Sequence, residues 1–146
     1  MKAFLAFVVL GILVACGSGG GSNGTAPDPT TPIAGTWHLF SVNGLPLPVS
    51  VQTDSGTFII RQDSLTIFDS GSWSETAIGS RLIPGGAQQT RVRVTQGTWT
   101  RRGATVTLVS TGGTLVYEGS FNGTQLLLTE PVTGFPFLFV HAIPTP

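Results

Sequence analysis

The sequence predicts an all-β domain, an antiparallel up-and-down β-barrel of about eight to ten short strands. The first observation is that apolar and polar residues alternate with period two over many short runs, and no run has the 3.6-residue period of an amphipathic helix. The second is that turn signals separate these runs at short intervals. Strands joined by short turns pair as a meander, and closing that meander into a barrel removes its exposed edges.

The alternation is clearest over residues 64–68, 91–95 and 104–108. We expect the longest break between strands over 79–89. Strands of roughly six residues favour a shallow or filled barrel interior. The predicted strands lie near residues 35–42, 46–52, 56–61, 64–69, 72–78, 90–100, 104–110, 114–121, 124–130 and 136–142.

Glycine-containing turns define the predicted hairpins. Asn43-Gly44 and Asn122-Gly123 are typical of two-residue type I′ turns, in which both central residues have positive φ. Residues 69–71, 101–103 and 111–113 look like three-residue loops with a glycine in the left-handed region.

Residues 1–15 are typical of a secretion signal. Lys2 supplies the positive charge, and the uncharged run over 3–15 is too short for the roughly 20 apolar residues of a spanning helix. Leu13-Val14-Ala15-Cys16 resembles a bacterial lipobox, in which the cysteine is lipidated and becomes the new N-terminus. The resemblance implies that Cys16 anchors an exported protein to the cell envelope, since several acyl chains exceed what stable membrane binding needs.

The alternative is an ordinary signal peptide followed by an unrelated cysteine. Cys16 is the only cysteine, so it has no internal disulfide partner, and lipidation accounts for it. Gly17, where an acidic residue would retain a lipoprotein, favours the outer membrane by resemblance to lipoproteins of diderm bacteria.

The chain divides into three parts. Residues 1–15 are the signal peptide, and residues 16–32 are the lipidated cysteine with a Gly/Ser/Pro-rich tether that cannot bury apolar surface. Residues 33–146 form one domain, long enough to bury a core. The seven Lys and Arg residues include one lysine, Lys2, so the mature chain keeps six arginines against seven acids, which predicts no nucleic-acid partner.

Gly-Ser/Thr-Trp occurs at Trp37, Trp73 and Trp99. Plain core packing at bends in the barrel is the usual role of such aromatics. As a second interpretation, the three tryptophans line a barrel mouth and bind a small apolar or amphipathic ligand.

The stretch GTWHLFSVNGLPLP, from Gly35 to Pro48, resembles the opening strand of lipocalin-like, small-barrel bacterial lipoproteins. The resemblance implies a lipocalin-like barrel whose G-x-W closes the base. Lipocalins pack an arginine of the last strand over that tryptophan, whereas residues 135–141 contain no arginine.

Residues with reactive side chains are few, and the sequence predicts no enzyme, no cofactor and no metal. His38 and His141 fall in the first and last strands, where closure could bring them together, with Glu118 or Glu130 as a possible third metal ligand. Two isolated histidines are more often structural. No serine sits in a nucleophile elbow and no spacing nominates an acid–base pair.

Arg91 and Arg93 alternate with Val92 and Val94, so the arginines share one face. The usual arrangement puts the valines inward and the arginines in solvent. The alternative turns the arginines inward, toward an anionic head group at the barrel mouth.

The sequence therefore favours a membrane-anchored, non-enzymatic barrel that binds a small apolar or amphipathic ligand. The alternative is a structural or protein-interaction lipoprotein with a packed barrel and an envelope-protein partner. An apolar cavity of several hundred Å³ would favour the first. An exposed apolar patch over 135–140 would favour the second, and converging acids with perturbed pKa values would favour an enzyme.

Overall fold

A computed structural model of the chain describes residues 31–53, 56–82 and 87–141. Every regular element in these segments is a β-strand. The strands are β1 (Gly35–Val42), β2 (Leu45–Pro46), β3 (Val49–Thr53), β4 (Gly56–Ile67), β5 (Ser72–Leu82), β6 (Gln88–Arg102), β7 (Thr105–Ser110), β8 (Val116–Phe121), β9 (Gln125–Thr129) and β10 (Pro136–His141).

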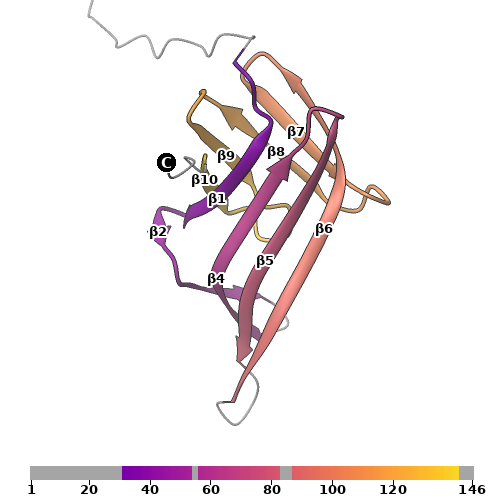
Figure 1. Cartoon of the computed structure of the whole chain (residues 1–146). Helices are drawn as coiled ribbons and strands as arrows, with labels where there is room; N and C mark the ends of the chain where they lie inside the picture. Colours follow the sequence, from indigo (N-terminus) through magenta and orange to yellow (C-terminus); the bar gives the residue numbers. More distant parts are fainter. Residues whose placement is uncertain (1–30, 54–55, 83–86, 142–146) are drawn as a thin grey trace, which may run out of the picture.

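The sheet closes on itself as a barrel. Strands β4 to β10 pair in sequence order, and β1 pairs with both β10 and β4, so these eight of the ten strands form a complete ring (Figure 1). Each pairing is antiparallel, and β2 and β3 lie beside β1 and β4. The predicted all-β, antiparallel up-and-down barrel is confirmed.

One end of the barrel, which we call the closed end, is filled by aromatic side chains. Trp37 is fully buried and meets Phe121 edge-on, with ring centroids 5.7 Å apart, and His141 at 4.8 Å. The Trp37 indole N–H donates to the carbonyl of Ile33, a buried residue just before β1. Chain entering the barrel therefore helps to seal this end.

An arginine also covers the closed end, although it does not come from the last strand. The guanidinium of Arg101, in β6, lies 4.8 Å from the centre of the Phe121 ring and donates to the carbonyl of Thr31. The predicted loop 101–103 is wrong, because β6 continues to Arg102, which pairs with Thr105. Only Gly103 and Ala104 remain between the two strands.

The predicted strands 56–61 and 64–69 are a single 12-residue strand, β4. A register shift between Ile60 and Gln62 marks a β-bulge, which inserts one extra residue and reverses the faces. Ile60 is buried before the bulge, whereas Asp63 is buried after it. In the sequence, the interruption of the apolar–polar alternation at this bulge therefore looks like a break between two strands.

Two further boundaries differ from the prediction. The predicted strand 46–52 is divided into β2 and β3, with a cis peptide bond between Leu47 and Pro48. The predicted break 79–89 is partly strand, because β5 continues to Leu82 and β6 begins at Gln88. Strands β4, β5 and β6, of 12, 11 and 15 residues, are all longer than predicted, because β4 joins two predicted strands and β5 and β6 extend past the predicted ranges 72–78 and 90–100.

The two Asn-Gly turns differ from one another. Asn43 and Gly44 both have positive φ, 50° and 76°, as a type I′ turn requires. At the second turn Gly123 has a φ of 98°, but the φ of Asn122 is not positive. Its side-chain oxygen instead accepts hydrogen bonds from the N–H groups of Thr124 and Gln125. Asn122 therefore acts as a local cap.

The first half of β6 projects beyond the barrel wall. β7 pairs with β6 only from Gly97 onward, where the Thr111 N–H bonds to the Gln96 carbonyl. Val92 and Val94 are 62% and 60% exposed, and the lower halves of β5 and β6 extend below the other strands in Figure 1. Among the described residues, this part of β6 is paired on one edge only, with β5.

The last strand is covered by its own barrel. Phe137 and Phe139 are buried in the core, whereas Leu138 and Val140 are half-buried on the outside. On this outer face Leu138 pairs with Leu127 of β9, which is 43% exposed, and the adjacent β1 carries Phe40, which is 60% exposed. None of the described residues belongs to a helix long and apolar enough to cross a membrane.

Candidate functional site

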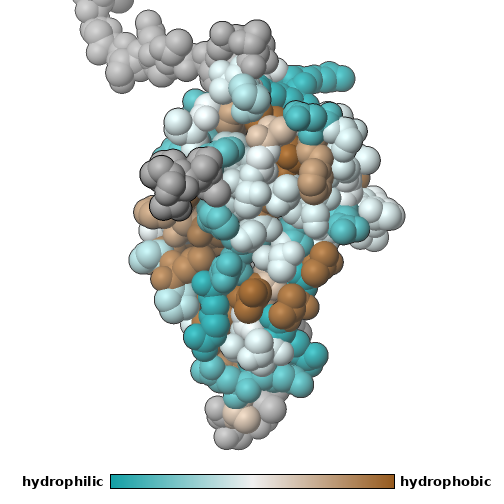
Figure 2. Space-filling view, viewed as in Figure 1, coloured by the Kyte–Doolittle hydropathy of each residue, from teal (hydrophilic) through white to brown (hydrophobic). Residues whose placement is uncertain are grey.

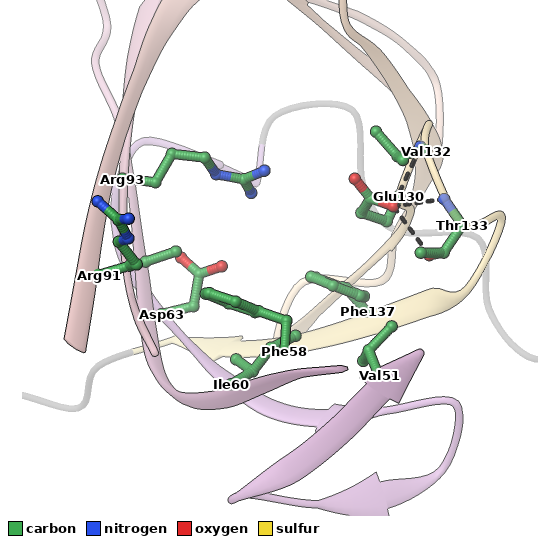
Figure 3. Close-up of a pocket in the computed structure, with 11 residues that line it drawn as sticks. Val51, Phe58, Ile60, Asp63, Arg91, Arg93, Glu130, Val132, Thr133 and Phe137 are labelled. Carbon is green, nitrogen blue, oxygen red and sulfur yellow. Dashed lines mark hydrogen bonds between the residues drawn. The ribbon is translucent and has the colours of Figure 1, made fainter. Parts of the chain in front are cut away.

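A cavity of about 280 Å³ lies at the end of the barrel opposite the closed end; we call this the cavity end (Figure 3). Its walls are mainly apolar, and charged side chains from three sides reach toward it. The cavity is lined by Val51, Phe58, Ile60, Asp63, Ala77, Arg91, Arg93, Glu130, Val132, Thr133 and Phe137.

The β4 bulge and one small side chain make this cavity. Phe58 and Ile60 line it from before the bulge, and Asp63 joins them because the bulge turns it to the same side. On β5 the inward positions are Trp73, Glu75 and Ala77, in order away from the closed end. Going away from the closed end, Trp73 therefore fills the first level of the interior and Glu75 forms a charged layer. Ala77 is too small to fill the third level, which is the cavity.

The charged layer centres on Glu75, which is 3% exposed. Its carboxylate accepts a hydrogen bond from the Tyr117 hydroxyl and pairs with the Arg93 guanidinium, both at 3.3 Å. The Tyr117 ring stacks edge-on against Trp73, with centroids 5.8 Å apart. Glu75 is thus a buried acid with two polar partners.

Asp63 is the buried acid of the cavity wall that lacks such partners. It is 1% exposed, and neither carboxyl oxygen has a hydrogen-bond partner among the described residues. Burial, reinforced by the nearby charge of Glu75, raises the pKa of Asp63 from 3.8 to about 8. Asp63 is therefore mostly uncharged at neutral pH.

The pKa values of two neighbours are also raised. Burial, followed by the negative charge of Glu75, raises the pKa of Tyr117 well above its ordinary value. For Arg93, burial alone would lower the pKa, but the charge of Glu75, with smaller contributions from Tyr117 and Asp63, raises it overall. Arg93 therefore stays cationic and Tyr117 stays neutral across the physiological range.

Glu130 lies across the cavity from Arg93 (Figure 3). Its Oε2 accepts hydrogen bonds from the N–H groups of Val132 and Thr133, at 3.0 and 2.7 Å, and from the Thr133 hydroxyl at 2.8 Å. This carboxylate fixes the turn between β9 and β10, which forms one rim of the cavity.

The structure decides the orientation of the arginine pair. Arg91 and Arg93 line the cavity, and Val92 and Val94 face solvent, so the usual arrangement, with valines inward, is wrong here. On its inward face this part of β6 meets the buried carboxylate of Glu75, with which Arg93 pairs. Arg91 donates to the side-chain oxygen of Gln89 at 2.6 Å.

The three tryptophans lie elsewhere in the barrel, and none of them lines this cavity. Trp37 and Trp73 are buried at the closed end, and Trp99 is half-buried against the same core. The Trp73 indole donates to the carbonyl of Thr98, and the Trp99 indole to that of Phe68. Cys16, the signal peptide and nearly all of the tether lie outside the described residues.

The two histidines occupy adjacent strands but opposite faces. His141 pairs with Trp37 and packs on its ring, whereas His38 pairs with Val140 and shares a hydrogen bond of 3.1 Å with the Ser64 hydroxyl. Glu118 is exposed on β8. In the three described segments, no group of three or more His, Cys, Asp or Glu side chains is placed to hold a metal ion.

The sequence analysis did not group the three buried acids Asp63, Glu75 and Glu130, although the sequence contains one indication that Glu75 is buried. Glu75 sits at an inward position of an alternating strand, between Trp73 and Ala77, where a charge is unusual. Asp63 gave no such signal, because the bulge disguises its face.

The comparisons with known proteins give a likeness of fold. No protein-family model matches the chain, and no curated protein matches it. Among solved structures, a lipocalin-like protein from Bacteroides uniformis is similar with a TM-score of 0.41 and 15% identity, over 75% of this chain and 97% of that one.

Proposed function

We propose that this protein is a membrane-anchored envelope lipoprotein, without enzymatic activity, that binds a small apolar or amphipathic ligand at the cavity end of its barrel. The anchor is the lipidated Cys16, on the outer membrane of a diderm bacterium. This assignment rests on the lipobox-like residues and on the short apolar run before them.

The observation that carries the binding proposal is the cavity. Its 280 Å³ lie near the lower end of the range for small-molecule sites, and its apolar walls with few polar groups are typical of them. Val51, Phe58 and Phe137 supply apolar surface, and Asp63 and Arg93 supply polar atoms that can orient a ligand.

The non-enzymatic part of the proposal rests on how the acids are used. Two of the three buried acids already have structural partners: Glu75 holds Arg93 and Tyr117, and Glu130 holds its own turn. Among the acids in the described segments, only Asp63 has a strongly raised pKa, and none of the described serines or histidines lines the cavity with it. Of these three acids only Asp63 has no fixed structural role, and one such acid fits ligand binding better than proton transfer between two groups.

An interaction role is the second candidate, favoured by the projecting half of β6. Its exposed Val92 and Val94 and its one-sided pairing offer a strand edge to another chain. Figure 2 shows hydrophobic residues grouped among hydrophilic ones at the level of the lower halves of β5 and β6.

Native mass spectrometry tests the binding proposal. The protein is taken from its own host in lipid nanodiscs, which avoids free detergent, and compared with Ala77→Leu, which fills the cavity, and with Val94→Leu on the outer face. We expect a reproducible small-molecule adduct on the wild type and on Val94→Leu, lost on denaturation and absent from Ala77→Leu. Bare wild-type protein after incubation with a host metabolite extract would rule out binding and favour the interaction role.

A further inference from the structure

Asp63 is one of the most deeply buried polar side chains, and it can donate a hydrogen bond to the neighbouring Glu75 carboxylate only while it is protonated. Once it is ionised, neither of its oxygens has a hydrogen-bond partner among the described residues. Its carboxyl group points toward the cavity beside Phe58 (Figure 3). Burying a polar group without a hydrogen bond costs roughly 1–3 kcal/mol, so such groups persist mainly where something else requires them. Here the carboxyl borders a cavity that can admit a ligand.

We infer that the ligand of this cavity carries a cationic amine, and that the carboxylate of Asp63 is its partner. The inference rests on the proposed binding function and specifies the chemistry of the ligand. An ammonium group can supply the hydrogen bonds that both oxygens of Asp63 lack, and its positive charge offsets theirs.

The charge balance around the cavity favours a cation over an anion. Arg93 is already paired with Glu75, and with Asp63 neutral the remaining lining charges are Arg91 and Glu130, one of each sign. An anion bound to Arg93 would compete with Glu75. An ammonium bound to Asp63 displaces no existing ion pair and introduces the one charge that the ionised carboxyl needs.

The apolar walls suit the rest of such a ligand. Phe58 and Phe137 line the cavity, and aromatic faces attract cations within about 6 Å of the ring centre. The cavity equals the liquid volume of about nine water molecules, which is enough for a compact amine.

Binding should release a proton. The amine enters as R–NH₃⁺, Asp63 passes from COOH to COO⁻, and its proton leaves to solvent. Because burial raises the pKa of Asp63 to about 8, affinity for the amine should rise with pH up to that value.

The other charged or titratable groups facing Asp63 come from four elements. Arg93 stays cationic and Tyr117 neutral over this window, because the pKa values of both are raised. Val51 and Phe137, which line the cavity from β3 and β10, do not titrate. The facing groups are Glu75 on β5, Arg91 and Arg93 on β6, Tyr117 on β8 and Glu130 after β9.

Calorimetry with three probes of one size tests the inference on the full chain in nanodiscs. The probes are 2-phenylethylamine, the neutral 2-phenylethanol and the anionic 3-phenylpropanoate. At pH 8.5 we expect the amine to bind at least tenfold more tightly than the alcohol, and at pH 6 less than threefold more tightly. In buffers of different ionisation enthalpy, the heat at pH 7 should report the release of up to one proton.

Asp63→Asn should remove the preference for the amine, and a far-UV circular dichroism spectrum equal to that of the wild type would show that the barrel is intact. Glu118→Gln, which neutralises an exposed acid on β8, is the matched control and should behave like the wild type.

The outcomes separate this inference from the proposed function. If the alcohol binds but the amine has no advantage, or keeps its advantage in Asp63→Asn, the amine inference is wrong and the binding function stands. Preferred binding of the anion, lost in Arg91→Gln, has the same meaning. A host adduct whose accurate mass excludes a basic nitrogen also overturns the inference. If none of the probes binds and no host adduct is found, the result contradicts both the amine inference and the proposed binding function.

Discussion

At the scale of single residues, the barrel interior holds charges that a filled core would not. Trp73, Glu75 and Ala77 follow one another at inward positions of β5 and divide the interior into a packed, a polar and a hollow level. The polar level is stable because Glu75 keeps two partners. Asp63 is the exception, and its effect on stability can be measured.

Asp63→Asn should stabilise the protein increasingly as pH rises. In the unfolded chain Asp63 loses its proton near pH 3.8, whereas in the native state it keeps the proton until about pH 8. Between these values the native state binds more protons, so this group lowers the free energy of unfolding by up to about 1.4 kcal/mol per pH unit. Urea unfolding of both proteins from pH 4 to 9 should show the difference widening up to pH 8 and then levelling.

Asp69→Asn is the control, because Asp69 is exposed in the turn between β4 and β5. It should follow the wild type at every pH. A constant difference between Asp63→Asn and the wild type would mean that Asp63 ionises at its ordinary pKa.

Trp73→Phe should cost roughly 1–3 kcal/mol of unfolding free energy, because the buried indole N–H lies 3.0 Å from the Thr98 carbonyl and 3.3 Å from that of Val109. Trp99→Phe should cost less, since its hydrogen bond to the Phe68 carbonyl is accessible to water. Urea titrations followed by circular dichroism compare the two, and equal losses would contradict this account.

At the scale of elements, two close approaches between strands require glycine. An added Cβ at Gly97 would overlap the carbonyl oxygen of Val109, and one at Gly119 would overlap that of Leu127. Neither residue has a positive φ in the structure, so the reason is space and not conformation. The glycine before Trp99 thus lets β6 and β7 approach, whereas Gly71 before Trp73 adopts the turn conformation, with a φ of 84°.

Gly97→Ala should destabilise the barrel by about 2 kcal/mol or more, because the backbone of β7 must move to admit the methyl group. Thr98→Ala, at the next and exposed position, should stay within about 0.5 kcal/mol of the wild type. Thermal unfolding of the two variants provides the comparison. An equal, small effect would show that β7 yields easily.

The elements also show what alternation in the sequence can and cannot predict. It located β1, β7, β9 and β10 to within about two residues, because each presents a regular inward face. It divided β4 at the bulge, where the alternation changes face. For Arg91 and Arg93 it could not decide which side of the strand faces inward, and the usual arrangement that it favoured, with the valines inward, is wrong. The candidate site depends on these two exceptions, so tertiary structure was needed to find it.

At the scale of the whole molecule, the closed barrel could be predicted because short glycine-containing turns place consecutive strands side by side, where they pair. The sequence did not predict which half of the interior is hollow. That depends on the taper from large rings at Trp37 and Phe121 to Ala77, and on the extra length of β4, β5 and β6.

Cys16→Ser should release the protein from membranes, because the chain would lose its only thiol and with it the acyl anchor. Fractionation of cells labelled with radioactive palmitate should find wild type labelled in the membrane fraction and Cys16→Ser unlabelled outside it. Ser18→Ala should behave as wild type. Label that persists in Cys16→Ser, or unlabelled wild type, would refute lipidation at this residue.

The position at which the chain joins the barrel bears on the side from which a ligand can enter the cavity. The tether meets the domain at Thr31 and Ile33, on the closed end, where Arg101 and Trp37 hold it. The cavity is at the opposite end, past the charged layer. If Cys16 anchors the chain in a bilayer, as proposed, the tether enters at the sealed base, and the mouth of the cavity opens at the end of the barrel farther from the attachment. A ligand could then enter the cavity from the surrounding water without passing the anchored end.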